Sequence, residues 1–520
     1  MPSVTDEARL TDLSVVNLDD LAIKSDAEVE EIDRRVADSP CFNRDLAPAG
    51  PSRRTWSTWN IAAMWIGMAV VITTYTLAAG LMASGMTWWQ ALLTITLGNL
   101  IVLIPMVLNA HAGVRYGIPF PVFVRASFGI RGANIAAIAR AIVACGWFGI
   151  QTWLGALALD ALLGQLWGGW TDIGWHRGIA FMAFWLFQVA IILRGMEAIK
   201  HLETWAAPLL LGGGIAILIW AFIKIGSVSE PFQSGAQDQL ISQGPGFWTL
   251  FWPALAASVG YWATLSLNIP DFTRFARSQK SQFIGQAIGL PFTMALFSFI
   301  GIAVTATTVI IYGEAIWDPI ALIDRFDSAA ILILAMIVIV AAQVTTNMAA
   351  NVVAPSNDFS NLWPRRITFK MGGIITALIG IAMFPWKIYE DLAAYIFTWL
   401  VGYGSFLGAI AAVMIVDYWL IRRERIDLVD LYSNDPRGRY WYSHGFNWRA
   451  IAAVAIAVIP VIPGFIEAAT TEGGVVTDPN ILDRFYTYGF GFTFLVSGVI
   501  YLVLMRMTAE EREPAYAQST

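Results

Sequence analysis

The chain has 520 residues, of which 57% are apolar and 13% carry a charge, and its mean hydropathy is +0.61. Soluble globular domains average about 25% charged residues, so this composition excludes an ordinary soluble fold and indicates an all-α membrane protein with many spans. The net charge of −6 says little about partners, because the first 55 residues alone hold twelve acidic and seven basic side chains. We expect a lipid bilayer around the chain and no nucleic-acid partner.

Twelve apolar stretches are long enough to cross a hydrocarbon layer of roughly 30 Å. They begin near Thr58, Trp89, Ala133, Gly178, Trp205, Phe247, Ala287, Ala330, Gly372, Leu392, Ala450 and Tyr486. The ninth stretch is cut short by Phe384 and Pro385. The sequence therefore predicts twelve transmembrane helices, preceded by an acidic tail over residues 1–55 and followed by a second tail over residues 508–520. We expect the acidic tail to be mostly unstructured, with a docked amphipathic helix around residues 29–36 as the alternative.

Basic residues alternate between the connections that this helix count predicts. The even-numbered connections hold seventeen Lys or Arg residues, whereas the odd-numbered connections hold five. Because cytoplasmic loops are enriched in Lys and Arg, the alternation supports the helix count and predicts that both termini are cytoplasmic.

Two of the predicted helices, over residues 58–83 and 247–267, carry residues that weaken a helix at mid-membrane depth. Gly67 and the pair Thr73 and Thr74 lie in the first, and Gly260 lies in the second. Unwound backbone is tolerated in a bilayer only where it lines a cavity, so two interrupted helices at matching positions indicate the substrate site of a transporter. Close packing on a neighbouring helix is the alternative role for each glycine.

Each interrupted helix opens a run of five helices, and five is an odd number, so the two runs enter the membrane from opposite sides. The sequence predicts two inverted repeats over residues 56–226 and 227–424, followed by two further helices over residues 425–507.

Three side chains in these helices suit a flat, polar ring. Trp147 and Gln151 are four residues apart in the third helix and share one helical face. Trp262 lies in the suspected break of the sixth helix, where a second indole is able to close on the other face of the same ring. Core packing for Trp147 and helix-to-helix hydrogen bonding for Gln151 are the alternatives.

The eighth helix is polar where a membrane helix is usually apolar. Thr345 and Thr346 present consecutive hydroxyls, which are hard oxygen ligands of the kind that sodium prefers. Bonding of these hydroxyls to backbone carbonyls one turn earlier is an equally weighted alternative. Asn351 offers donors and an acceptor to a substrate edge.

Neither interrupted helix, nor the polar part of the eighth, contains an ionisable side chain other than tyrosine. Intramembrane charges normally mark proton relays or charged substrates, so we expect a neutral substrate that carries a lactam, imide or urea group. Arg140, near one end of the third helix, is interpreted as an anchoring or helix-end residue, with a gating role left open.

The sequence lacks a phosphate-binding GK[ST] loop, so we expect transport driven by an ion gradient rather than by ATP. It also lacks a clustered nucleophile, base and orienting group, and a Cys or His pattern typical of a metal centre. We therefore expect no enzymatic activity and no cofactor apart from a coupling ion.

Several long motifs resemble the nucleobase:cation symporter-1 family. They are residues 147–160, residues 115–119 with Arg125 and residues 128–132, residues 345–351, and residues 417–423 followed by residues 430–432. The resemblance runs from about Trp56 to Met507. It implies a LeuT-type fold, made of a 5+5 inverted repeat plus two C-terminal helices, that works by alternating access.

The resemblance also implies roles for individual residues. It makes Trp147 and Trp262 a stacking pair, and Gln151 and Asn351 the hydrogen-bonding amides. It implies a sodium site on the backbone carbonyls of Gly67, Val70 and Ala342 and on the hydroxyls of Thr345 and Thr346. Two pocket positions depart from a relative in the family: Val71 stands where that relative has glutamine, and Tyr261 stands where it has glycine.

Together these features predict an inner-membrane symporter for a small neutral heterocycle: uracil, cytosine, allantoin or a hydantoin, with thiamine or a purine as less favoured alternatives. Sodium is favoured over protons as the coupling cation, because the paired hydroxyls are present and the sequence shows no carboxylate beside the predicted pocket. A passive channel and a membrane sensor that signals through the acidic tail are the rival functions.

Overall fold

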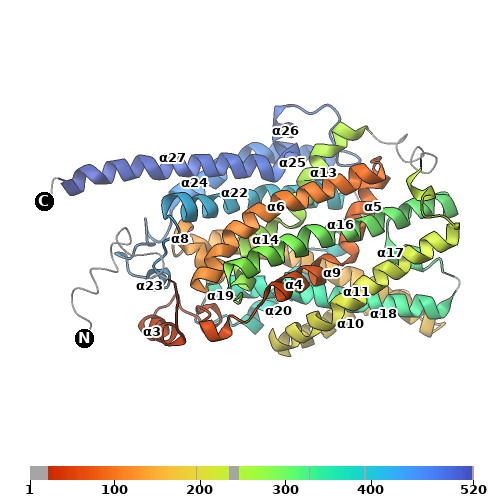
Figure 1. The fold of residues 1–520 in the computed structure, drawn as a ribbon, viewed down its shortest axis with the longest axis horizontal. Helices are drawn as coiled ribbons and strands as arrows, with labels where there is room; N and C mark the ends of the chain where they lie inside the picture. The colour runs from red at the N-terminus through yellow and green to blue at the C-terminus, as the bar shows by residue number, and fades with distance from the viewer. Residues whose placement is uncertain are drawn as a thin grey trace.

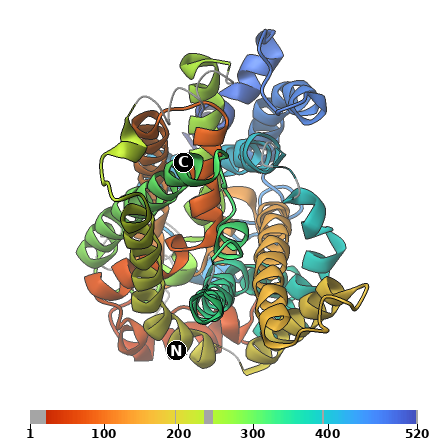
Figure 2. The same cartoon turned by 90° about the vertical axis from the view of Figure 1, so that its right-hand side faces the viewer.

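The computed structural model describes residues 22–194, 196–233, 245–326, 328–389, 391 and 394–517. Over these residues the chain forms helices, turns and isolated bridges, without a β-strand. The long helices run roughly along the longest axis of the molecule (Figure 1), and the view along that axis shows them gathered into one bundle (Figure 2).

The first half of the chain contains the following helices and short helical turns. They are α3 (Asp26–Val36), η1 (Arg44–Leu46), η2 (Pro51–Arg53), α4 (Thr58–Ala69), α5 (Ile72–Ala83), α6 (Trp88–Tyr116), α7 (Phe120–Phe123), α8 (Arg125–Phe128), α9 (Ala133–Leu166), α10 (His176–Arg194), α11 (Met196–Ile225) and η3 (Glu230–Phe232).

The second half continues the bundle with a larger number of broken helices. They are α13 (Phe247–Tyr261), α14 (Ala263–Asn268), α15 (Pro270–Thr273), α16 (Gln279–Tyr312), α17 (Pro319–Ile323), α18 (Ala329–Asn351), α19 (Val353–Leu362), α20 (Phe369–Ala382), α21 (Pro385–Ile388), the π-helix η4 (Ala394–Leu400), α22 (Val401–Ile415) and the π-helix η5 (Val416–Ile421). The C-terminal part comprises α23 (Leu428–Leu431), α24 (Trp448–Val458), η6 (Ile459–Val461), α25 (Ile462–Thr470), α26 (Ile481–Thr487) and α27 (Gly489–Ala517).

Each of the twelve predicted segments overlaps at least one of these helices, although the predicted start near Leu392 lies outside the described residues. Within the described residues, eight helical stretches are long and apolar enough to cross a membrane, or nine if α4 and α5 form one span. The chain is thus a multi-pass membrane protein. The count of twelve crossings and the repeat boundaries at residues 56, 227 and 425 stay predictions.

The first interrupted helix is broken between Gly67 and the threonine pair rather than at either. Gly67 is still helical within α4, and the helical backbone is lost at Val70 and Val71 before α5 begins. Val71 is extended, with φ −148° and ψ 156°, and α4 and α5 meet at an angle of 59°. The break leaves the last carbonyls of α4 without the N–H groups that a continuous helix would supply.

The second interrupted helix changes at a single residue. Trp262, with φ −108° and ψ 9°, separates α13 from α14, as the sequence predicts. Gly260 lies inside α13 and serves close packing instead, since a Cβ there would lie 2.3 Å from the Leu400 carbonyl oxygen. Packing, which was the alternative for this glycine, is therefore its observed role.

The N-terminal segment differs from the expected unstructured tail. Residues 26–36 form α3, and Leu46 and Ala49 are fully buried. Arg125 Nη2 donates to the Cys41 carbonyl at 3.0 Å, and Arg274 Nη1 donates to the Asp45 carbonyl at 3.2 Å. Carbonyls of the turn at Cys41 and of η1 satisfy these guanidinium groups, which explains why residues 22–55 dock on the body despite their acidic composition. Residues 1–21 lie outside the described part.

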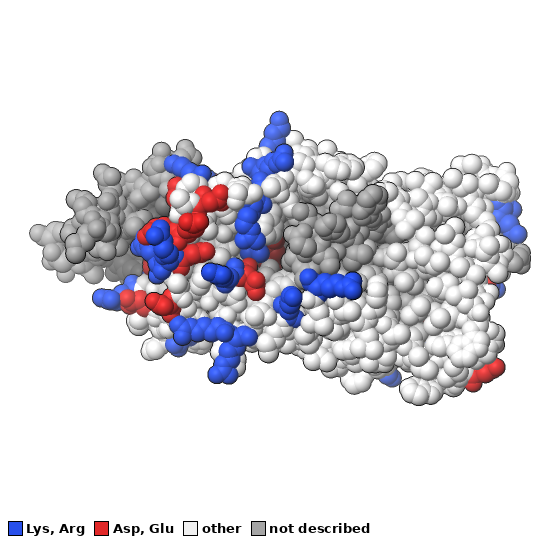
Figure 3. All heavy atoms as spheres, turned by 90° about the horizontal axis from the view of Figure 1, so that it is seen from below, with Lys and Arg blue, Asp and Glu red and all other residues white. Residues whose placement is uncertain are grey.

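Charged side chains gather at one end of the molecule. Figure 3 shows Lys, Arg, Asp and Glu side chains concentrated toward the end that carries the chain termini in Figure 1, while much of the other half is uncharged on this face. Basic residues from several even-numbered connections meet there: Arg365 donates to the Asp38 carbonyl, and Arg422 Nη2 donates to the Ala126 carbonyl at 2.7 Å. The alternating charge pattern of the sequence therefore corresponds to one physical end.

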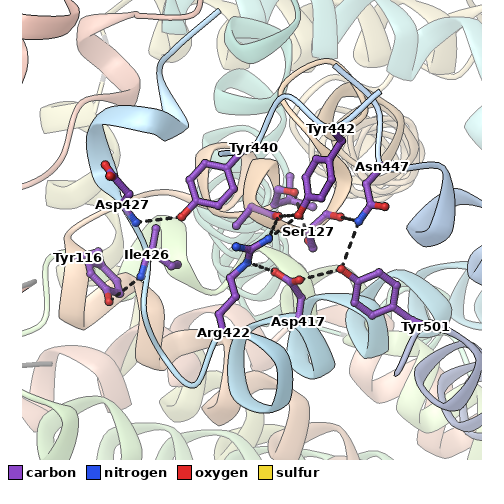
Figure 4. Close-up of polar contacts among 12 residues, drawn as sticks. Tyr116, Ser127, Asp417, Arg422, Ile426, Asp427, Tyr440, Tyr442, Asn447 and Tyr501 are labelled. Carbon is purple, nitrogen blue, oxygen red and sulfur yellow. Dashed lines mark hydrogen bonds and ion pairs between the residues drawn. The ribbon is translucent and has the colours of Figure 1, made fainter. Parts of the chain in front are cut away.

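A buried ion pair fixes the end of η5 in this region (Figure 4). Arg422 Nε lies 2.6 Å from Asp417 Oδ2, and the Tyr501 hydroxyl of α27 donates to Asp417 Oδ1 at 2.7 Å. Asn447 Nδ2 donates to the Ser127 carbonyl at 2.6 Å and to the Tyr501 hydroxyl at 3.3 Å. The network ties η5, α27, α24 and the α8 connection together.

We expect Asp417→Asn to destabilise the protein by about 3 kcal/mol, because removing one member of a buried ion pair leaves the other charge without compensation. The measurement is thermal unfolding of the detergent-solubilised protein. Asp435→Asn is the matched control, since Asp435 pairs with Arg437 at 2.9 Å on the exposed surface, where such pairs contribute little. Equal unfolding temperatures for the two variants would contradict the structural role of Asp417.

Candidate functional site

A small cavity lies where α4, α9, α13, α14 and α18 meet. Its lining residues are Met68, Trp147, Gln151, Tyr261, Trp262, Thr264, Leu265, Thr346, Ala350 and Asn351. Five of the six predicted substrate-binding residues belong to this lining. The cavity volume is about 20 Å³, which is room for about one water molecule.

The phenol of Tyr261 fills much of the space between the two predicted stacking residues. Its ring contacts Trp147 edge-on at 5.2 Å and Trp262 edge-on at 5.0 Å between centroids. Its hydroxyl lies 2.7 Å from Thr73 Oγ1 and 3.0 Å from Thr74 Oγ1, on the first turn of α5. The two indoles therefore flank a tyrosine ring of the chain itself.

The two amide side chains are held by hydrogen bonds to residues outside the cavity lining. Gln151 Nε2 donates to Thr73 Oγ1 at 3.2 Å. Asn351 Nδ2 donates to Asn347 Oδ1 at 3.0 Å, and Asn347 Nδ2 donates to Gln188 Oε1 at 2.7 Å. Sequence reasoning missed Asn347 and Gln188; the signal for Asn347 was its position one turn before Asn351.

Two polar atoms of the lining residues are buried without a hydrogen-bond partner. They are the Gln151 Oε1 acceptor and the Trp262 Nε1 donor. Buried polar groups are normally satisfied, so an unpaired acceptor and an unpaired donor beside one cavity mark a place that a ligand or water completes. The cavity lining contains no charged side chain.

Oxygen atoms converge where the break of α4 meets α18. The Thr346 hydroxyl donates to the Gly67 carbonyl at 3.0 Å, and the Thr345 hydroxyl donates to the Ala341 and Ala342 carbonyls at 3.1 and 3.0 Å. Thr345 thus shows the back-bonding considered from the sequence, whereas Thr346 bonds across to the other helix. These hard oxygen donors fit a sodium ion better than a transition metal.

Val71 differs in position from the other predicted pocket residues. With Val70 and Ala342, it lines a separate apolar cavity of about 610 Å³ between α5, α11, α16, α17 and α18. The unwinding at Val70 and Val71 rotates the chain out of helical register, which explains why Val71 is absent from the wall that carries Trp147. The structure therefore does not bring Val71 to the small cavity.

Arg140 is not an anchoring residue at a helix end. It is fully buried in α9, and its Nη1 lies 3.6 Å from Oδ2 of Asp358, which is also fully buried. Asp358 belongs to α19, the continuation of the helix that carries Asn351. The predicted polar run of the eighth helix ends at Asn351, before Asp358, so this carboxylate was not predicted.

Comparisons with known proteins agree with this architecture. A family model described as "Permease for cytosine/purines, uracil, thiamine, allantoin" matches residues 48–488. The chain belongs to this family. It is consequently a permease and not an enzyme, and the resemblance drawn from the sequence motifs is confirmed.

Two curated relatives match over most of their length. The chain is 42% identical to the purine-uracil permease NCS1 of Arabidopsis thaliana, over 90% of this chain and 78% of that protein. It is 40% identical to the allantoin permease of Bacillus subtilis, over 89% of this chain and 93% of that protein.

Solved structures confirm the predicted fold. Mhp1, a nucleobase-cation-symport-1 family transporter solved in a closed conformation with bromovinylhydantoin bound, matches with a TM-score of 0.73 and 27% identity, over 91% of this chain and 96% of that chain. A Na⁺-coupled sialic acid symporter shares the fold with a TM-score of 0.62 at 14% identity, over 93% of this chain and 95% of that chain. The permease therefore has the LeuT-type fold.

We expect Gly260→Ala to lower the stability of the permease by roughly 1–3 kcal/mol, as overpacking of a tight contact does. The added Cβ would meet the Leu400 carbonyl oxygen at 2.3 Å, and backbone atoms are unable to move aside as a flexible side chain does. Thermal unfolding in detergent measures the change. Gly491→Ala in α27 is the control, because nothing lies within 4 Å of its added Cβ. An unchanged Gly260→Ala melting curve would contradict the packing role.

Proposed function

We propose that this permease is a secondary active symporter that imports a neutral nucleobase or related cyclic ureide by alternating access coupled to a cation gradient. Uracil, cytosine, allantoin and hydantoin are the candidate substrates, and sodium is favoured over protons. The protein lies in the cell inner membrane with both termini in the cytoplasm.

The unpaired acceptor and donor beside the small cavity carry the proposal for the substrate. An imide or urea edge presents an N–H beside a C=O, which complements Gln151 Oε1 and Trp262 Nε1. The uncharged lining favours a neutral ligand, because a charged ligand would enter without a compensating charge. The names of the relatives, which include uracil, allantoin and hydantoin permeases, support the same class.

Trp147 and Trp262 would hold the two faces of the bound ring. Trp147 is oriented by a hydrogen bond from its Nε1 to the Tyr403 hydroxyl at 3.1 Å. Trp262 is oriented by an edge-on contact with Trp65 at 5.1 Å between centroids. Aromatic pairs contribute about 0.5–1.5 kcal/mol beyond area burial, so two oriented indoles select a planar ligand.

The oxygen cluster at the α4 break supports the proposal for the ion. Gly67, Val70 and Ala342 would bind sodium through backbone carbonyls, and Thr345 and Thr346 through their hydroxyls. The Thr346 hydroxyl already joins α18 to the Gly67 carbonyl of α4, so an ion at this point would hold the two helices together.

The basic residues that meet at the terminus-bearing end support the proposed orientation. They come from even-numbered connections, and Lys- and Arg-rich connections are retained in the cytoplasm. The amphiphilic division in Figure 3 fits an uncharged segment in lipid and a charged end in the aqueous phase.

The decisive experiment measures uptake of labelled uracil, cytosine, allantoin and hydantoin into cells that express the permease, with and without a sodium gradient. We expect accumulation of at least one compound against its own gradient, which a passive channel is unable to produce.

Trp147→Ala should reduce uptake about tenfold, because it removes one stacking face of the site. Thr346→Ala should raise the sodium concentration for half-maximal uptake about tenfold, as loss of a ligand oxygen weakens an ion site.

Thr346→Ser is the matched control, since it retains the hydroxyl and should keep the sodium dependence. Uptake that does not depend on sodium but follows a proton gradient would contradict sodium as the coupling ion and indicate protons instead. Absence of uptake for all four compounds, with the protein present in the membrane and folded, would contradict the substrate class.

A further inference from the structure

The position of Tyr261 deepens the proposed function by indicating which ligands the site accepts. We propose that the Tyr261 phenol is a built-in competitor of the substrate, which occupies the site between Trp147 and Trp262 and restricts transport to small planar rings without a bulky substituent. The inference rests on the proposed assignment of this cavity to the substrate.

The contacts of the phenol resemble those expected of a bound ring. Its ring lies between the two indoles, with centroid distances of 5.2 Å to Trp147 and 5.0 Å to Trp262. Its hydroxyl bonds to Thr73 Oγ1, the same atom that accepts from Gln151 Nε2 at 3.2 Å. Tyr261 therefore contacts both indoles edge-on and bonds to the same threonine as Gln151, so a heterocycle placed between the indoles would compete with it.

The remaining space excludes simultaneous binding. With Tyr261 in place, the cavity of about 20 Å³ accommodates about one water molecule, whereas a heterocyclic ring is several times larger. A ligand that stacks between the indoles must displace the phenol. Tyr261 is suited to this movement because it is the last residue of α13, directly before the non-helical Trp262.

Displacement exchanges one set of hydrogen bonds for another. The departing hydroxyl releases Thr73 Oγ1 and Thr74 Oγ1 for a ligand, while Gln151 keeps its bond to Thr73 and offers its unpaired Oε1. A ureide edge forms hydrogen bonds in place of these, whereas an apolar substituent forms none. The substituent also needs volume that the displaced phenol continues to occupy. Ligands with a compact polar edge are therefore selected over substituted ones.

Two substitutions separate the volume of Tyr261 from its hydrogen bonds. Tyr261→Ala removes the phenol and opens the site, so larger rings should gain affinity relative to small ones. Tyr261→Phe keeps the ring but loses the bonds to Thr73 and Thr74, so the internal competitor is weakened. We therefore expect Tyr261→Phe to raise the affinity for small and large ligands alike by roughly threefold to tenfold, which is the net contribution of a hydrogen bond. The size selectivity should not change.

The experiment uses hydantoin and bromovinylhydantoin as a matched pair that differs only in the substituent. Each unlabelled compound competes against whichever labelled substrate the wild-type permease accumulates. We expect hydantoin to compete at least about tenfold better than bromovinylhydantoin in the wild-type protein. Tyr261→Ala should reduce this ratio to threefold or less, and Tyr261→Phe should leave the ratio unchanged while lowering both inhibition constants.

Tyr389→Phe is the control for loss of a buried tyrosine–threonine hydrogen bond. The Tyr389 hydroxyl lies 2.6 Å from Thr76 Oγ1, on the same helix α5, but Tyr389 does not line the small cavity. It should change neither inhibition constant. Thermal unfolding of each variant in detergent establishes that the proteins are folded.

The outcomes distinguish this inference from the proposed function. Accumulation of a labelled substrate by the wild-type protein, with the same hydantoin ratio in Tyr261→Ala, would overturn the role of Tyr261 alone. Equal competition by hydantoin and bromovinylhydantoin in the wild-type protein would also overturn the role of Tyr261. So would a lack of competition by either compound in both the wild type and Tyr261→Ala. If the wild-type protein accumulates none of the four candidate substrates, the proposed function and this inference both fail.

Discussion

The structure depends on one constraint, which is that hydrocarbon offers no hydrogen-bond partner to the peptide backbone. A helix inside the bilayer can therefore break only where other groups satisfy its free carbonyls and N–H groups. The break at Val70 and Val71 meets this requirement beside α18, where the Thr346 hydroxyl donates to the Gly67 carbonyl. The same free carbonyls that make the break costly are the ligands of the proposed cation site.

Buried polar side chains obey the same constraint and thereby build the second site. Asn347 and Gln188 bond to each other and to residues of α9, so Asn351 is held toward the cavity by a fully paired network behind it. Gln151 is only half satisfied, through Thr73, and its Oε1 has no partner. The lining thus combines rigid support with a small number of unpaired groups, which is the usual composition of a pocket that orients a polar ligand.

The sequence predicted the apolar helices and the shared helical face of Trp147 and Gln151, because both depend on local patterns. Apolar runs fix the spans, and the four-residue spacing fixes the shared face of Trp147 and Gln151. It bracketed the first break between residues 67 and 74 without identifying Val70 and Val71, since glycine and threonine propensities do not show where a neighbouring helix supplies partners. It also missed contacts between distant segments: Thr73 and Tyr261 are 188 positions apart, and Arg140 pairs with Asp358. A single sequence contains no signal for such pairs.

The two proposed sites share residues, and this would give the proposed coupling a physical basis. Thr346 lines the small cavity and also donates to the Gly67 carbonyl, while Met68, the next residue of α4, lines the same cavity. An ion bound by Thr346 and Gly67 would replace this hydrogen bond and so would change the cavity wall beside a bound ring. By thermodynamic reciprocity, a ligand that stabilises this wall increases the affinity for the ion by the same factor. A coupling of this kind needs no long pathway through the protein, because one threonine side chain belongs to both sites.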